Sequence, residues 1–126
     1  MKPLYPMHTA ILVSDLAQAQ HFYGTVLGLS QIERPTTMKF PGCWYQLGDY
    51  QIHLILDEID GSPTPTPLRN PQKWGRNSHL AIAIADIDAA RAHLHTHNWP
   101  MQESSSGRPA VFTQDPDGNI IELQAT

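Results

Sequence analysis

The stretch HTAILVSDLAQAQHFYGTVLGL, residues 8–29, decides the fold because its opening is repeated later in the chain. HTAILVSDL at 8–16 corresponds to HLAIAIADI at 79–87, and QIHLIL at 51–56 corresponds to NIIELQ at 119–124. Each half therefore has an apolar strand that opens with histidine and a later apolar strand that carries a histidine or a glutamate. This repeat predicts two related modules within one domain of 126 residues.

Each half is predicted to fold as a strand, a helix and three further strands. Apolar residues alternate with small or polar ones in the two opening strands, which is typical of strands with one packed face. Apolar residues then recur at helical spacing after each opening strand. Ser14 or Asp15 can cap a helix that ends near Leu27, and Asp86 or Asp88 can cap one that ends near His97. The remaining strands are expected at about 31–33, 42–47, 51–56, 101–103, 110–114 and 119–124, with tight turns at 48–49 and 115–118.

The fold class that this pattern indicates is α+β, with two βαβββ modules forming a curved mixed sheet around a metal cleft. The first module is expected at about 4–58 and the second at about 77–126, within a single domain spanning 1–126. Between them, at about 59–76, lies a linker that contains the proline-rich run GSPTPTPLRNPQKWGR. Its prolines favour an extended path over a helix or an inner strand.

Four residues of metal-ligand type occupy the repeated positions, since His8 corresponds to His79 and His53 corresponds to Glu122. Burying such side chains among apolar strand residues costs free energy unless they are hydrogen-bonded, paired or coordinated. A pair of modules related by a pseudo-twofold axis would bring the four together, so we expect one divalent ion (Zn, Ni, Co, Mn or Fe(II)) bound by all of them. Taken singly, each residue is better interpreted as an exposed or hydrogen-bonded side chain, and only the four together favour a metal.

Arginine and aromatic side chains are the candidate substrate contacts. Arg108 precedes the strand at 110–114, where its guanidinium could bind a substrate carboxylate, although a surface arginine is an equally good interpretation. Trp44 and Tyr45 share a strand, with Phe40 close by in the sequence. Because neighbouring strand residues face opposite sides, only one of Trp44 and Tyr45 can face a cavity.

Composition excludes several classes of partner. The net charge is −4 and no basic stretch is present, so nucleic acid is not an expected partner. The N-terminus lacks the apolar core of a signal peptide, and no apolar run is long enough to cross a bilayer. The single cysteine, Cys43, cannot form an internal disulfide. These features predict a cytoplasmic protein that binds a small molecule, and the linker makes a homodimer the expected assembly.

Residues 8–29 resemble the opening of the vicinal oxygen chelate superfamily, and DPDGNIIEL at 115–123 resembles its closing strand. The resemblance covers nearly the whole chain. This superfamily includes glyoxalase I, extradiol dioxygenases, methylmalonyl-CoA epimerase and metal-free bleomycin-binding proteins, all built from paired βαβββ modules. The resemblance implies that His8, His53, His79 and Glu122 are the metal ligands.

Two residues depart from the patterns of these relatives. His53 stands where the glyoxalase I pattern has glutamate and the epimerase pattern has glutamine, which leaves Glu122 as the one base candidate among the expected ligands. Three neutral imidazoles and one carboxylate also leave a divalent ion with a formal charge near +1, which makes it a stronger Lewis acid. Leu12 stands where bacterial glyoxalase I has an arginine for the glutathione carboxylate, which argues against glutathione.

The function expected from these observations is that of a metal-dependent, glyoxalase-like lyase or isomerase, with Glu122 as the catalytic base. An Fe(II) extradiol-type ring-cleaving dioxygenase is the first alternative, because histidine-rich ligand sets also suit Fe(II). A non-catalytic protein that sequesters a small molecule, as bleomycin-resistance proteins do, is the second. Metal content, isomerisation of hemithioacetals and oxygen uptake with catechols distinguish the three.

Overall fold

The computed structural model describes residues 1–59, 62–63 and 70–126. The chain forms two compact units, Met1–Pro65 and Thr66–Thr126, and each has its own sheet. Within the described ranges, no helix is long and apolar enough to span a membrane.

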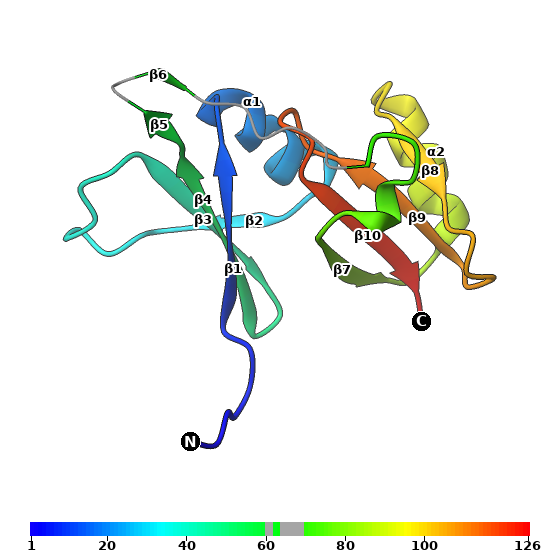
Figure 1. Ribbon diagram of the computed structural model, residues 1–126, viewed down its shortest axis with the longest axis horizontal. Helices are drawn as coiled ribbons and strands as arrows, with labels where there is room; N and C mark the ends of the chain where they lie inside the picture. The colour runs from blue at the N-terminus through cyan, green and yellow to red at the C-terminus, as the bar shows by residue number, and fades with distance from the viewer. Residues whose placement is uncertain (60–61, 64–69) are drawn as a thin grey trace. The chain divides into compact units, whose positions relative to one another are not determined.

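Unit 1 is a four-stranded mixed sheet with one helical segment (Figure 1). Its sheet runs in the order β1-β4-β3-β2, in which β1 and β4 are parallel and the other neighbours are antiparallel. The elements are β1 (His8–Val13), α1 (Leu16–Gln20), the π-helix η1 (His21–Val26), β2 (Ser30–Ile32), β3 (Gly42–Leu47), β4 (Tyr50–Leu56) and the short antiparallel pair β5 (Glu58–Ile59) and β6 (Ser62–Pro63).

Unit 2 repeats this arrangement with the order β7-β10-β9-β8, and β7 and β10 are again the parallel pair. Its helix α2 contacts β9 and β10. The elements are the 3-10 turn η2 (Trp74–Arg76), β7 (His79–Ile84), α2 (Ile87–Thr96), β8 (Met101–Glu103), β9 (Ala110–Gln114) and β10 (Ile120–Ala125).

The prediction of an α+β fold with two βαβββ modules is therefore confirmed. Both helices begin where expected, at Leu16 and Ile87. The Asp15 side chain caps the first by accepting a hydrogen bond from the Gln18 amide, and the Asp86 side chain caps the second by accepting from the amides of Asp88 and Ala89. The first helix continues past Gln20 as a π-helix, which the sequence pattern did not predict.

The proline-rich run was predicted to favour an extended path over a helix, and Trp74–Arg76 instead form a 3-10 turn at its end. Ser62–Pro63, near its start, are extended and pair with Glu58–Ile59. The turn is anchored by Gln102 on β8, whose side-chain oxygen accepts from the Trp74 amide at 2.9 Å. Residues 60–61 and 64–69 of the predicted linker lie outside the described residues.

Strand register places the predicted ligands at equivalent points of the two units. In unit 1, Ala10 on β1 is the register partner of His53 on β4. In unit 2, Ala81 on β7 is the register partner of Glu122 on β10. The residues that cover the opposite sheet faces, among them Ile11, Ile52 and Leu123, are buried. The sequence repeat is therefore a repeat of structure, with a small side chain beside each ligand candidate.

Candidate functional site

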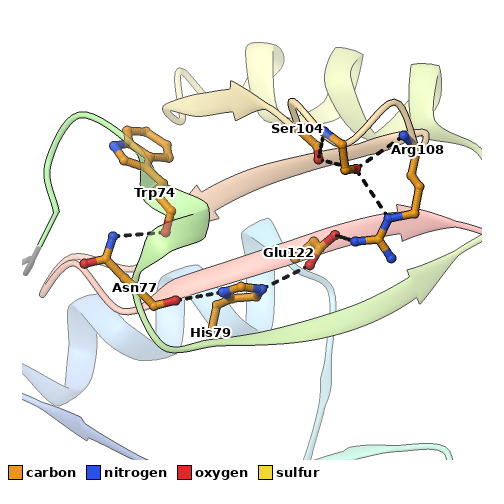
Figure 2. Close-up of polar contacts among 7 residues, drawn as sticks. Trp74, Asn77, His79, Ser104, Arg108 and Glu122 are labelled. Carbon is orange, nitrogen blue, oxygen red and sulfur yellow. Dashed lines mark hydrogen bonds and ion pairs between the residues drawn. The ribbon is translucent and has the colours of Figure 1, made fainter.

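His79 and Glu122 form the centre of the candidate site in unit 2. The carbonyl oxygen of Asn77 lies 2.8 Å from Nδ1 of His79, and since a carbonyl can only accept, Nδ1 carries the proton. The other ring nitrogen, Nε2, lies 3.1 Å from Oε2 of Glu122. Figure 2 shows this chain of contacts from the loop before β7 to β10.

The nature of the contact between His79 and Glu122 depends on whether the imidazole is protonated. If the imidazole is protonated, His79 and Glu122 form an ion pair. If it is neutral, the lone pair of Nε2 faces a carboxyl oxygen, and two acceptors at this distance need either a proton on that carboxyl group or a metal ion beside them. Glu122 is only 3% exposed, and its second oxygen, Oε1, is buried without a hydrogen-bond partner.

Arg108 approaches this carboxylate without making a hydrogen bond to it. Its Nη2 lies 3.6 Å from Oε1 of Glu122, which is beyond hydrogen-bond range. Its Nε is 3.3 Å from the hydroxyl of Ser106, which accepts the bond and steadies the guanidinium (Figure 2). Arg108 is 57% exposed, so most of its donor groups remain available to a ligand.

A pocket of about 450 Å³ surrounds these residues, and all of its lining belongs to unit 2. Its walls come from the η2 turn, the turn after β8, and strands β7, β9 and β10. Gly75 packs on Phe112 so closely that a Cβ at this position would lie 2.7 Å from the ring. The pocket thus combines one aromatic wall with a polar end that holds His79, Arg108 and Glu122.

The ligand candidates of unit 1 lie in an aromatic stack. The rings of His8 and His53 are stacked with their centroids 4.1 Å apart, and the other face of His53 stacks on Trp44 at 3.8 Å. His53 is buried, and burial followed by the neighbouring His8 lowers its pKa, which favours the neutral imidazole.

A chain of side-chain amides sets the tautomer of His53. The Gln46 amide nitrogen donates to the carbonyl of Gly48 at 2.6 Å, so its oxygen is the group that accepts from Gln51 at 3.2 Å. The Gln51 oxygen then lies 2.8 Å from Nε2 of His53, which must be the donor. Nδ1 of a neutral His53 therefore carries the lone pair.

Comparison with known proteins identifies the chain's family. Residues 6–123 match the Glyoxalase/Bleomycin resistance protein/Dioxygenase superfamily. The chain belongs to this superfamily. The resemblance to vicinal oxygen chelate proteins is thereby confirmed, and the match covers both units.

Several individual proteins of the superfamily are similar to this chain. The uncharacterized protein YaeR of Escherichia coli K12 is 33% identical over 92% of both chains. Glyoxylase I 4 of Arabidopsis thaliana is 25% identical, over 92% of this chain and 67% of its own, and human mitochondrial methylmalonyl-CoA epimerase is 26% identical, over 93% and 71%. A glyoxalase family protein from Bacillus anthracis has a related fold, with a TM-score of 0.81 and 22% identity over 100% of this chain and 98% of its own.

The structure brings the expected superfamily ligands together in two pairs, His8 with His53 and His79 with Glu122. The pairs belong to different units, and within neither unit do the described residues gather three potential ligands. A single site made of all four therefore stays a prediction.

The predicted substrate contacts lie in different environments. Arg108 lines the pocket of unit 2, and Trp44 stacks on His53. Tyr45 is 1% exposed and lies in the core beside Tyr23, so Trp44 is the one of the two that shares the histidine face. Phe40 is exposed in the loop before β3, where the guanidinium of Arg34 lies over its ring.

Sequence reasoning missed several residues of the site. Lys73 and the serines at 104–106 line the pocket, and Gln51 holds His53. The run SSSGR before β9 was a usable signal, because hydroxyls and an arginine in one turn form a cluster of donors. Gln51 gave no such signal, since its role depends on a neighbouring side chain.

Proposed function

We propose that this chain is a metal-dependent lyase or isomerase of the glyoxalase type, acting on a small substrate that binds the metal through oxygen atoms. The observation that carries the proposal is the pairing of His79 with the buried carboxylate of Glu122 in the wall of a pocket. The similarity to glyoxylase I 4 supports the same class of reaction.

The His79 and Glu122 side chains fit a divalent ion. Nε2 of His79 is 3.1 Å from Oε2 of Glu122, close enough for both atoms to bind one divalent ion. A bond from the other ring nitrogen to a backbone carbonyl is the common support of a metal-bound histidine, and the Asn77 carbonyl provides it. Oε1 of Glu122 makes no hydrogen bond, and Nη2 of Arg108 stays 3.6 Å away, so this oxygen keeps an acceptor site that an ion could use.

In this proposal His8 and His53 complete the ligand set. The ion, when bound, would polarise a substrate oxygen and make a neighbouring C–H group more acidic. Glu122 is then the group that accepts and returns the proton. Two carboxylates line the pocket, Glu103 and Glu122. Glu103 is held by two hydrogen bonds from Arg91, which leaves Glu122 as the candidate base. Phe112 and the η2 turn, which pack together at Gly75, form one wall of the pocket.

Ring cleavage by an Fe(II) extradiol-type dioxygenase is a second candidate, and one observation favours it. The His53 ring is stacked between His8 and Trp44. If this stacking keeps Nδ1 of His53 away from the ion, His8, His79 and Glu122 remain as two histidines and one carboxylate, the ligand set of many non-haem Fe(II) oxygenases. Sequestration of a planar molecule without turnover is the third interpretation, for which the exposed part of the Trp44 and His8 stack would serve.

Replacing His53 by Ala separates the two enzyme proposals. With four ligands, loss of His53 is expected to weaken metal binding about tenfold or more, and the lyase account predicts lower metal occupancy in purified protein. Elemental analysis measures this, with His95→Ala on the exposed side of α2 as the matched control. Full occupancy by iron in His53→Ala would instead support the three-ligand dioxygenase.

Activity assays complete this test. The lyase proposal predicts isomerisation of hemithioacetals by protein loaded with Zn, Ni or Co, and the alternative predicts oxygen uptake with catechols under Fe(II). Inactivity with every hemithioacetal under all three metals would contradict the glyoxalase-type assignment.

The expected homodimer also stays a proposal, and the mass in solution measured by analytical ultracentrifugation tests it.

A further inference from the structure

Positive charge is concentrated around the pocket of unit 2. The whole chain has eight lysines and arginines and a net charge of −4. Three of the eight, Lys73, Arg76 and Arg108, line this one pocket. The carboxylates that line it are Glu103 and Glu122. Such a local excess, opposite in sign to the protein as a whole, raises the concentration of anions at the pocket.

Glu103 does not offset these cations, because its charge is already paired. Nε and Nη2 of Arg91 donate to its two oxygens at 2.8 and 2.9 Å, and this bidentate contact lowers the pKa of Glu103. Arg91 also donates to Asp88 at 2.7 Å, so it brings no surplus positive charge. Three cations therefore share the pocket with Glu122, the one lining carboxylate that Arg91 does not hold. It contacts Nε2 of His79 and lies 3.6 Å from Nη2 of Arg108.

Arg108 is oriented for a ligand rather than consumed by the protein. Its Nε is bound by Ser106, whose hydroxyl in turn contacts the hydroxyl of Ser104 at 2.8 Å. Its Nη2 stops 3.6 Å from Glu122, too far to neutralise that carboxylate through a hydrogen bond. A divalent ion on Glu122 would remove even this attraction and leave the guanidinium without a counter-charge.

We infer that this pocket binds an oxyanion group of the substrate, a carboxylate or a phosphate, through the guanidinium of Arg108, with Lys73 and Arg76 contributing to the positive field. This inference rests on the proposed function, because it assigns a second, anionic group to the molecule whose oxygen atoms meet His79 and Glu122. A planar fork of donors suits both carboxylate and phosphate, and the hydroxyls at 104–106 supply further donors.

The test is isothermal titration calorimetry of the full-length protein with inorganic phosphate and with succinate. Each titration is made both on the protein as purified and on protein from which EDTA has removed the metal. Succinamide, which has the size of succinate without its charge, is the matched neutral probe. Wild type is expected to bind at least one of the two anions, and Arg108→Gln to weaken that binding about tenfold or more. Lys39→Gln, the same charge change on an exposed side chain of unit 1, is expected to bind like wild type.

The outcomes separate this inference from the proposed function. Tighter binding of phosphate than succinate would indicate a phosphate ester, and the reverse a carboxylic acid. Loss of affinity in Arg108→Gln that persists in metal-free protein supports the inference even if no metal-dependent activity is found. The inference is overturned if neither anion binds, if succinamide binds as well as succinate, or if Arg108→Gln and Lys39→Gln bind alike.

Discussion

Replacing Glu122 by Gln is expected to abolish metal binding while leaving the fold intact. The substitution keeps the shape of the side chain but removes the negative charge, and with it the carboxylate expected to balance most of the charge of a divalent ion. Because the buried carboxylate contacts Nε2 of His79 and lies 3.6 Å from Nη2 of Arg108, losing its charge is expected to destabilise metal-free protein by about 1–3 kcal/mol. Metal content is expected to fall from about one ion per chain to a trace, which elemental analysis measures. Circular dichroism checks that the variant is still folded.

Glu103→Gln is the matched control for this variant. Glu103 lines the same pocket, but both of its carboxylate oxygens are held by Arg91. The Glu103→Gln variant is expected to keep the metal content and the activity of wild type. Equal metal content in Glu122→Gln and wild type would mean that Glu122 is no ligand.

The largest expected loss of stability follows from Gly42→Ala. Gly42 opens β3, and a Cβ there would lie 2.3 Å from the backbone oxygen of Leu54 and 2.9 Å from Nη1 of Arg34. The Leu54 oxygen belongs to the neighbouring strand β4, so relief requires separating two paired strands. Overpacking against backbone of this kind costs about 2–4 kcal/mol, which urea denaturation measures.

Gly24→Ala is the control for this second prediction. Gly24 lies in η1, and its Cβ would make an ordinary contact of 3.5 Å with the Tyr45 hydroxyl. Alanine also lowers the conformational entropy of the unfolded chain, so Gly24→Ala is expected to lie within about 1 kcal/mol of wild type. Equal denaturation midpoints for the two variants would contradict the close approach of β3 and β4 at Gly42.

The strands were predictable because their signal is local. The runs at 42–47, 101–103 and 110–114 have the bounds expected from apolar and turn residues. The strands expected at 31–33, 51–56 and 119–124 differ by one residue at their ends, and the short β5 and β6 were not predicted. Helix starts were predictable for the same reason, since Asp15 and Asp86 cap within their own chain segment. The π-helix was not, because its geometry serves the packing of Phe22 and Tyr23, both fully buried in the core.

The candidate site could be predicted only as far as the repeat reached. The repeat identified His79 and Glu122, and strand pairing brings them into contact across β7 and β10. It could not predict that Gln51 binds His53, or that Ser106 orients Arg108, because these contacts join side chains whose own sequence neighbourhoods are ordinary polar ones. The η2 turn was missed since prolines dominate its surroundings, while the Gln102 side chain that anchors it is distant in sequence.

A crystal of protein saturated with a divalent metal, analysed by anomalous scattering, tests the central claim most directly. The account predicts one ion per chain with Nε2 of His79 and Oε2 of Glu122 as ligands, each about 2.0–2.2 Å away, and His8 and His53 completing the site. An ion bound elsewhere, or a saturated crystal in which His79 and Glu122 contact only each other, would contradict it.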